Sequence, residues 1–201
     1  MFVVDDDDAV RDSLEALLMA CGYDPVAFPT GVEFLDACED IGSGCVLLDI
    51  RMPGMDGMEV QARLSARHPN LPVIMITGHG DVAMAVRAMK AGAVDFIEKP
   101  IREEALLESI EAALQMAREA GRQHSLGAEA RDRIGRLTPR EREVMEMLVI
   151  GRPNKVIAQA LNCSPRTVEI HRARVMEKMS ARSIPHLVRL ALAAGIEPDL
   201  N

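Results

Sequence analysis

The sequence predicts two parts of different class: a doubly wound α/β domain and, after it, a small all-helical domain. In the first 120 residues, short apolar runs alternate with helical patterns in five successive units, which is typical of a sheet with helices on both faces. Three of those runs are apolar throughout, as expected of parallel strands buried on both faces. The remaining chain contains helical patterns alone. We therefore expect a doubly wound five-stranded parallel sheet, followed by a four-helix domain.

The α/β domain follows from a regular succession of strands and helices. We expect strands at Phe2–Val4, Pro25–Phe28, Cys45–Leu48, Val73–Ile76 and Asp95–Ile97. Helical patterns lie near Val10–Cys21, Val32–Cys38, Gly57–His68, Val82–Ala91 and Glu103–Ala120. Sheets of this kind bind ligands at the carboxyl ends of their strands. The residues that follow each strand are therefore the candidates for a site.

The helical domain begins with a strong helix start. Thr138 suits the N-cap, Pro139 the first helical position, and Glu141 completes a capping box. Ser164-Pro165 repeats this start further along. We expect one helix from Pro139 to Ile150 and three more at Asn154–Leu161, Pro165–Met179 and Pro185–Ala194. Helix, short turn and helix is the pattern of a DNA-binding helix-turn-helix, with the third helix in the recognition position.

We place the α/β domain at residues 1–118 and the helical domain at residues 137–201. Residues 119–136 between them are polar, hold three glycines and have no clear apolar stripe. This pattern leaves open whether the preceding helix continues or a flexible linker follows. Charge divides at the same place: residues 1–120 hold nine Lys or Arg and 22 Asp or Glu, whereas residues 121–201 hold 14 and nine. An acidic and a basic half indicate different partners.

The composition excludes several classes of protein. No run of 18 apolar residues predicts a transmembrane helix, and the N-terminus lacks the basic and apolar regions of a signal peptide. The four cysteines have no zinc-like spacing, so we expect buried thiols in a reducing cytoplasm. All five aromatic residues lie in the first half. A basic domain without aromatic side chains favours double-stranded DNA over single strands or RNA.

Chemically distinctive residues follow four of the expected strands. Asp5 to Asp8 follow the first strand, Asp49 the third, Thr77 the fourth and Lys99 the fifth. Adjacent carboxylates need a cation, and Mg²⁺ (or Mn²⁺), held by one or two carboxylates and water, would serve. Asp49 beside that metal would be a nucleophile toward a phosphoryl group. Thr77 could donate its hydroxyl to a phosphoryl oxygen, and Lys99 could pair with another oxygen or with the carboxylate.

Each feature also has a purely structural interpretation. An Asp run after a strand is typical of a solvated helix N-terminus, which favours negative charge. A lone Thr or Lys at a strand end is nearly always structural. The four features together, at the ends of four strands, favour a phosphoryl site. No organic cofactor is implied.

These residues resemble the receiver domain of two-component response regulators, which implies a flavodoxin-like fold. The resemblance is carried by Val4–Asp7, Leu48–Gly57, Thr77-Gly78 and Phe96–Pro100. In the helical part, Leu137–Val144, Asn154–Ala158 and Ser164–His171 resemble the LuxR-type helix-turn-helix. The two domains in this order are similar to the NarL/FixJ family. The similarity is especially close to its FixJ-type branch, including Thr77–Asp81 and Pro185–Val188.

The resemblance implies a chemical role for the residues after the first and third strands. Asp49 would be the phosphoacceptor. Asp6, assisted by Asp5, would form the acidic pair that holds the metal together with Asp49. The backbone carbonyl of Arg51 would be a further metal ligand. Arg51 and His79 would flank the pocket, where the family varies.

The resemblance also implies how the phosphoryl group is sensed. Thr77 and Lys99 would be drawn toward it, because phosphorylation adds negative charge and acceptor oxygens. Phe96 would be the switch aromatic that turns inward when Thr77 moves, although simple core packing also explains a phenylalanine there. The helix Val82–Ala91 and the strand Asp95–Ile97 would form the dimer face, and we expect Val86 and Lys90 in it.

The recognition helix has two expected faces. Its core face holds Val168, His171, Val175 and Met179 at helical spacing, which makes His171 a packing residue rather than a ligand. The candidates for base contacts are Arg166, Thr167, Glu169, Ile170 and Ala173. The candidates for phosphate contacts are Lys155, Arg172, Arg174 and Lys178. The alternative for these basic residues is an ordinary solvated face.

The sequence thus predicts a cytoplasmic transcription regulator rather than an enzyme or a membrane protein. Its expected partners are a sensor histidine kinase, promoter DNA, RNA polymerase and, after phosphorylation, a second copy of the chain. One alternative is a constitutive DNA-binding protein that uses its receiver only for docking. The other is a Mg²⁺-dependent phosphatase of the haloacid-dehalogenase type, suggested by Phe2–Asp7. That segment lacks the expected Gly-Thr after the second aspartate, and no domain remains to build a substrate cap.

Overall fold

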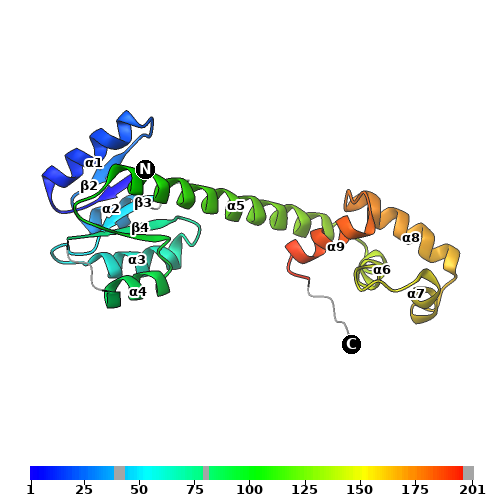
Figure 1. Cartoon of the computed structure of the whole chain (residues 1–201). Coiled ribbons are helices and arrows are strands. Elements are labelled where there is room, and N and C mark those ends of the chain that lie inside the picture. The colour runs from blue at the N-terminus through cyan, green and yellow to red at the C-terminus, as the bar shows by residue number, and fades with distance from the viewer. Residues whose placement is uncertain (39–43, 79–81, 197–201) are drawn as a thin grey trace. The chain divides into compact units, whose positions relative to one another are not determined.

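The chain folds into two compact units, Met1–Ala120 and Gly121–Asn201, in a computed structural model that describes residues 1–38, 44–78 and 82–196. The first unit is a five-stranded parallel sheet with helices, and the second is helical (Figure 1). Both fold classes are as predicted. Within the described residues, no helix is long and apolar enough to cross a membrane.

The sheet brings the ends of β1 and β3 together. Its strands are β1 (Phe2–Val4), β2 (Val26–Phe28), β3 (Val46–Asp49), β4 (Val73–Thr77) and β5 (Asp95–Glu98). They lie in the order β2-β1-β3-β4-β5, and every neighbouring pair is parallel. After β1 the chain forms β2 on one side of that strand and then returns to form β3 on its other side. This switch point is where open α/β sheets bind ligands, and Asp5 and Asp49 lie there.

Side-chain caps fix where the helices of the first unit begin. The helices are α1 (Asp8–Ala20), α2 (Gly31–Ala37), α3 (Gly57–Arg67), α4 (Val82–Lys90) and α5 (Glu103–Gly135). Asp7, Thr30 and Asp56 each accept backbone hydrogen bonds as N-caps of the first three. The cap at Asp7 explains why α1 begins two residues before the expected Val10.

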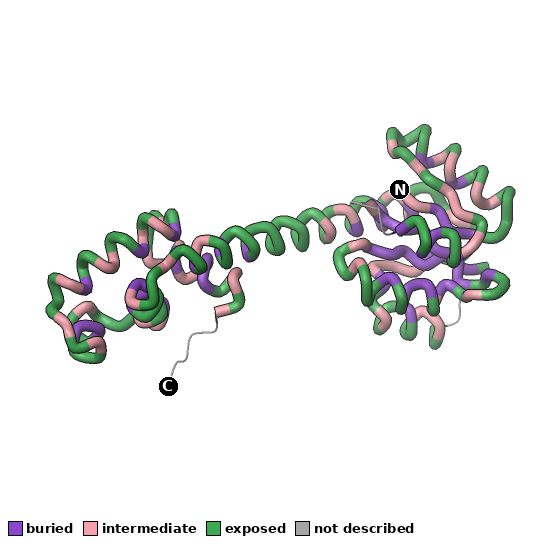
Figure 2. The backbone as a smooth tube through the Cα atoms, turned by 180° about the vertical axis from the view of Figure 1, so that it is seen from behind, coloured by how far each residue is buried: buried purple, intermediate pink, exposed green. Residues whose placement is uncertain are grey.

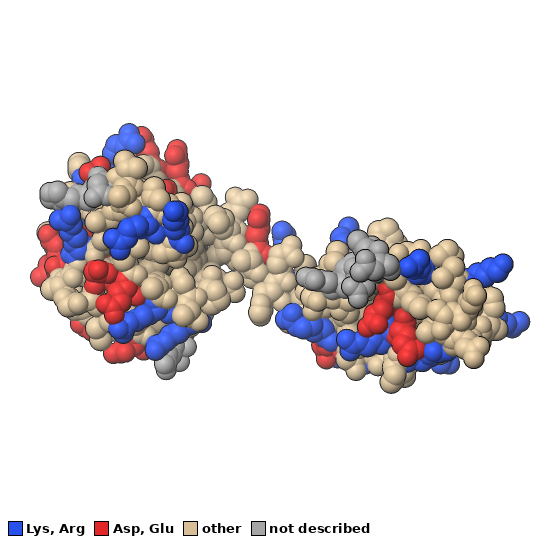
Figure 3. Space-filling model, turned by 90° about the horizontal axis from the view of Figure 1, so that it is seen from below, with Lys and Arg blue, Asp and Glu red and all other residues tan. Residues whose placement is uncertain are grey.

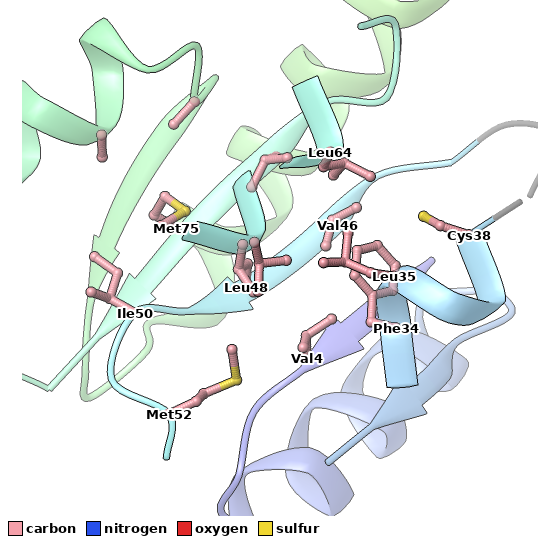
Figure 4. Packing of buried hydrophobic residues seen from close by; sticks show 14 residues of the cluster. Val4, Phe34, Leu35, Cys38, Val46, Leu48, Ile50, Met52, Leu64 and Met75 are labelled. Carbon is pink, nitrogen blue, oxygen red and sulfur yellow. The ribbon is translucent and has the colours of Figure 1, made fainter. Parts of the chain in front are cut away.

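Alternation along the buried strands builds one core on each face of the sheet. Leu48 and Val4 pack toward α2 and α3, with Phe34 and Leu64 (Figure 4). Leu47 and the neighbouring side chains of the opposite face pack with residues of α1 and α5. The purple strands of Figure 2 show this double burial. Because β1, β3 and β4 are covered on both faces, their carboxyl ends are held firmly in place.

Helix α5 settles the question that the sequence left open, because it continues through the expected linker to Gly135. Its first turns belong to the core of the first unit through Leu106 and Ile110. Residues 118–126 are all exposed. Its last turns bury Ala130 and Ile134 in the core of the second unit. The sequence shows no continuous apolar stripe here because residues 118–126, in the middle of the helix, are exposed.

The second unit is built from the end of α5 and four further helices. These are α6 (Pro139–Val149), α7 (Asn154–Ala160), α8 (Pro165–Lys178) and α9 (Ile184–Ala193). The predicted capping box of Thr138 and Glu141 is present, and Ser164 caps α8 as expected. Three of the four expected core residues of α8 are fully buried, and His171 is half-buried between them.

The expectation of buried thiols is correct for Cys38 and Cys45, wrong for Cys21 and only partly met by Cys163. Cys21 is exposed because α1 ends at Ala20 and Cys21 is its C-cap, beyond the last buried turn. Cys163 is half-buried in the turn before α8. Burial raises the pKa of the Cys45 thiol to about 12.

A buried ion pair ties α6 to α8. The Lys178 ammonium lies 2.6 Å from Oε2 of Glu141, whose side chain is 2% exposed. The same carboxylate accepts a hydrogen bond from the Thr138 backbone N–H at 2.9 Å. These hydrogen bonds, with Lys178 first, lower the pKa of Glu141 to about 2. A buried carboxylate with two donors, one of them a cation, is a structural centre of this unit.

Glu141→Gln tests this centre, because it keeps the shape and removes the charge. We expect the free energy of unfolding to fall by about 1–3 kcal/mol near neutral pH. A lowered carboxyl pKa stabilises the fold above its ordinary value of 4.5 and ceases to do so as the pH falls toward 2. The difference between wild type and variant should therefore shrink across that range. Urea unfolding followed by circular dichroism measures it, with the exposed Glu143→Gln as control. A difference that persists unchanged below the range would contradict the assignment.

Candidate functional site

Residues from four strands meet at the carboxyl edge of the sheet. Asp5 follows β1, Asp49 ends β3, Thr77 ends β4, and Lys99 follows β5. The side chains of Asp5 and Asp49 are 2% and 5% exposed, and Thr77 is fully buried. Two carboxylates so poorly hydrated require a compensating cation.

Lys99 supplies that cation. Its ammonium lies 2.7 Å from Oδ2 of Asp5 and 2.7 Å from Oδ1 of Asp49. The backbone N–H of Lys99 donates to the Thr77 carbonyl at 2.7 Å, which holds the segment after β5 against the end of β4. The lysine side chain is 24% exposed. The structure therefore brings together four residues that are as many as 94 positions apart in the sequence.

Burial is the largest single influence on the pKa values of Asp49 and Lys99, but it decides the direction of the shift only at Asp49. Desolvation raises the pKa of Asp49 above its ordinary value, and the hydrogen bond from Lys99 lowers it only in part. Burial also opposes the charge on Lys99, but its hydrogen bonds to Asp49 and Asp5 outweigh that effect, and the pKa of the ammonium is raised. The bridge thus favours the charged form of a carboxylate that burial by itself disfavours.

The turn after β3 positions the Asp49 side chain. The backbone N–H of Arg51 donates to Oδ2 of Asp49 at 2.6 Å, so both carboxylate oxygens have a donor. Gly57 begins α3 and donates its N–H to the Ile50 carbonyl at 2.9 Å. A Cβ at Gly57 would collide with the Asp49 carbonyl. Gly54 has a φ of +83°, which favours glycine. The requirement for glycine at these two positions explains their spacing from Asp49 in the segment Asp49–Gly57.

The four successive aspartates have different surroundings. Asp5 is in the pocket, and its Oδ1 accepts from the Asp7 backbone N–H at 3.0 Å. Asp6 is exposed beside it. Asp7 caps α1, and Asp8 pairs with Arg11. The structural interpretation of the Asp run thus holds for Asp7 and Asp8, whereas Asp5 lies in the buried site and Asp6 is exposed.

Arg11 also helps to hold Asp5 in place, and the sequence alone did not predict this contact. Its Nη1 donates to the Asp5 backbone carbonyl at 2.6 Å. The acidic residue three positions before it on α1 was its only sequence signal.

The donors at this edge fit a hard divalent cation. Across residues 1–38, 44–78 and 82–196, no three His, Cys, Asp or Glu side chains are grouped to hold a metal by themselves. Mg²⁺ needs fewer protein ligands, because it keeps several waters. The carboxylates of Asp5 and Asp49, the exposed Asp6 and the Arg51 carbonyl are all oxygen donors, which Mg²⁺ and Mn²⁺ prefer.

The expected switch aromatic lies on β5, and the expected dimer residues lie on α4. Phe96 on β5 is half-buried and packs against the core on the α3 side. Val86 is exposed on α4, in line with the exposed Val82 and Met89, and Lys90 is exposed one turn after Val86. The only buried residue of α4 within the described segment 82–90 is Ala88. His79 lies outside the described residues.

Helix α8 presents a polar face. Arg166, Glu169, Ile170 and Ala173 line one open hollow on it, and Arg174 is exposed as well. Thr167 is half-buried and its hydroxyl lies 2.8 Å from that of Ser164. Lys155 on α7 is exposed. On the face seen in Figure 3, Lys and Arg outnumber Asp and Glu over this unit, at the right of the view.

Two of the candidate phosphate contacts have partners inside the protein. Lys178 bridges Glu141 and the Arg136 carbonyl. Arg172 Nη1 lies 3.5 Å from Oδ1 of Asn154, at the start of α7. The sequence shows the charge of these residues but not their long-range partners. Arg140, which sequence reasoning did not single out, donates to the Leu161 carbonyl and so caps the end of α7.

Comparisons with known proteins agree with both halves of this description. A family model described as the response regulator receiver domain matches residues 1–111, and one described as bacterial regulatory proteins of the luxR family matches residues 135–191. The transcriptional regulatory protein FixJ of Bradyrhizobium diazoefficiens is 46% identical over 99% of this chain and 97% of its own length. FixJ of Azorhizobium caulinodans is 49% identical over 98% of this chain and 93% of its own.

Solved structures give the same result. The response regulator StyR has a TM-score of 0.80 and 41% identity, covering 95% of this chain and 96% of its own. Full-length FixJ from B. japonicum has a TM-score of 0.59 and 47% identity, covering 96% of each chain. The comparisons therefore extend over both units and the α5 segment that links them in sequence.

Proposed function

The chain belongs to the FixJ-like response regulators, with a receiver domain and a LuxR-family DNA-binding domain, and we propose that phosphorylation of Asp49 controls its binding to promoter DNA. The observation that carries this proposal is the Lys99 bridge to two buried carboxylates. It supplies a nucleophile, a cation and an oxygen-lined edge in one place.

The proposed step is phosphoryl transfer to Asp49. One carboxylate oxygen forms a bond to phosphorus while the bond from phosphorus to the donor breaks. That bond is P–N in a phosphohistidine of a sensor kinase and P–O in acetyl phosphate, and its electron pair leaves with the imidazole or the acetate. Lys99 then pairs with a phosphoryl oxygen in place of the carboxylate oxygen it holds now. A bound Mg²⁺, held by Asp5, Asp6, Asp49 and the Arg51 carbonyl, would offset the phosphoryl charge.

The new charge is read by the neighbouring strand ends. Thr77 lies in the same buried edge and offers a hydroxyl, and Phe96 lies on the adjacent strand β5. Movement of these two side chains would change the face of α4 and β5, which carries Val86 and Lys90. A second copy of the chain would bind this face. A paired operator would then be bound more tightly by mass action.

On DNA, we assign base contacts to Arg166, Thr167, Glu169, Ile170 and Ala173, which lie on the first three turns of α8. Lys155 and Arg174 are the phosphate contacts that the exposed surface supports best. Arg172 can also reach a phosphate, through a modest change from its long contact with Asn154. Lys178 has the strongest internal partners of the set, and we assign it a structural role.

The two alternatives have less support. A receiver used only for docking would not need a lysine between two buried carboxylates at the switch point. A phosphatase would need a substrate cap, and the residues after the receiver match a DNA-binding family instead. We therefore propose a cytoplasmic regulator that works with a sensor histidine kinase and RNA polymerase, and not an enzyme with turnover.

The acceptor is tested by intact-mass spectrometry after treatment with acetyl phosphate and Mg²⁺. We expect one added phosphoryl group, abolished by Asp49→Asn and unaffected by the exposed Asp12→Asn. Asp6→Asn should slow labelling, because it removes one charge facing the cation. The nucleophile is the carboxylate, and burial raises the pKa of Asp49. As the pH is lowered, labelling should therefore begin to fall at a pH above 3.8, the ordinary pKa of an aspartate side chain. Undiminished labelling of Asp49→Asn would refute the assignment.

The dimer face is tested by Val86→Asp. Val86 is 46% exposed, and Val32 on α2, at 49%, is a matched control. We expect Val86→Asp to accept the phosphoryl group normally but to remain monomeric by light scattering, because a charge at an apolar contact must be desolvated on association. Val32→Asp should dimerise like wild type. Dimerisation of phosphorylated Val86→Asp would place the interface elsewhere.

A further inference from the structure

We propose that Arg133, in the last turn of α5, positions the recognition helix α8 for DNA by capping its C-terminus. Its Nη1 donates to the Met179 carbonyl at 3.1 Å, and Met179 is the C-cap of α8. The last carbonyls of a helix have no partner within the helix. A guanidinium there satisfies one of them and opposes the negative end of the helix dipole. This inference rests on DNA binding by α8 and is independent of phosphorylation.

A second hydrogen bond joins the same two helix ends in the opposite direction. Lys178, in the last turn of α8, donates to the Arg136 carbonyl at 3.2 Å, just after α5 ends. Arg136 in turn donates its backbone N–H to the Arg133 carbonyl at 3.1 Å. The end of each helix therefore caps the end of the other. Both links combine charge with a backbone carbonyl, which makes them stronger than neutral hydrogen bonds.

The last turns of α5 are also packed firmly enough to act as a support. Ala130 is fully buried and Ile134 is 7% exposed in the core of the second unit. At Gly127, a Cβ would lie 2.5 Å from the Ala193 carbonyl, so α5 and α9 approach without a side chain between them. These turns precede residue 135, where the match to the luxR family model begins. They form an additional helix of the DNA-binding unit, and α8 is held from outside the helix-turn-helix.

This support acts on the helix that carries the base-contact candidates. The core anchors of α8 are Val168, Val175 and the following Met179. Arg133 acts at the last of these anchors. Loss of its hydrogen bond would free the C-terminal end of α8 to tilt, and the hollow lined by Arg166 and Glu169 would move with the helix. Base contacts, which read the sequence, depend on that placement, whereas contacts to the phosphates carry no sequence information.

Arg133, in the last turn of α5, and Arg136, just after its end, make a matched pair for the test. Arg133 pairs with Glu129 and Arg136 with Asp132, each at 2.6 Å and each one helical turn apart. Replacement by glutamine removes one charge and one such ion pair in both cases. Only Arg133 also donates to Met179 among the described contacts. The backbone carbonyl of Arg136 that Lys178 uses is kept in Arg136→Gln.

The experiment uses the full chain and a duplex selected from a random-sequence pool by the wild type, with a scrambled duplex for comparison. We expect Arg133→Gln to weaken binding to the selected duplex by about five- to tenfold and to the scrambled duplex by less than about twofold. Arg136→Gln should change both by less than about twofold. Arg133→Lys should recover part of the loss, because a cation remains at the helix end.

Circular dichroism of every variant at the binding temperature separates positioning from folding. The proposal is overturned if folded Arg133→Gln binds the selected duplex like wild type, or if it loses affinity for both duplexes equally. It is also overturned if Arg136→Gln weakens binding to the selected duplex as much as Arg133→Gln does. Failure of the wild type to select any duplex would overturn DNA binding itself. The difference in affinity between Arg133→Gln and Arg136→Gln should be the same with acetyl phosphate and without it. Loss of that difference in one treatment would refute the claimed independence from phosphorylation.

Discussion

The receiver unit depends on one interaction, the Lys99 ammonium between the carboxylates of Asp5 and Asp49. The order of the strands brings those carboxylates together, because β1 and β3 are neighbours and both end at the same edge. Apolar packing on both faces of the sheet then keeps water from compensating their charge. Without a cation the edge would repel itself, and with one it becomes a site where the cation can exchange partners.

The DNA-binding unit contains a similar pair with the opposite purpose. Glu141 and Lys178 are also a carboxylate and a lysine at short distance, but the carboxylate there is committed to a capping box. Its pKa of about 2 keeps it charged at every physiological pH. In the receiver, burial raises the pKa of Asp49 instead. The same two residue types thus lower the pKa of the carboxylate in one unit and leave it raised in the other.

The sequence predicts the fold and the location of the site for identifiable reasons. Continuous apolar runs mark strands covered on both faces, and the residues that follow them must gather at one edge, so Asp49, Thr77 and Lys99 could be placed together. The continuation of α5 could not be predicted, because its exposed middle has no apolar pattern and its last turns pack on helices far along the chain. The partners of Lys178 and Arg172 could not be predicted either, since charge shows in the sequence but a long-range acceptor does not. Cys21 was misplaced because the exact end of α1 decides its exposure.

We propose that the phosphorylation of Asp49 controls DNA binding. The most direct test is the affinity of the full chain for a duplex selected by the phosphodonor-treated wild type, measured with and without acetyl phosphate and Mg²⁺ in wild type and in Asp49→Asn. We expect the donor to tighten binding by wild type and to have no effect on Asp49→Asn, while both proteins bind a scrambled duplex alike. Equal tightening of both proteins, or no response of a wild type shown to be phosphorylated, would contradict it.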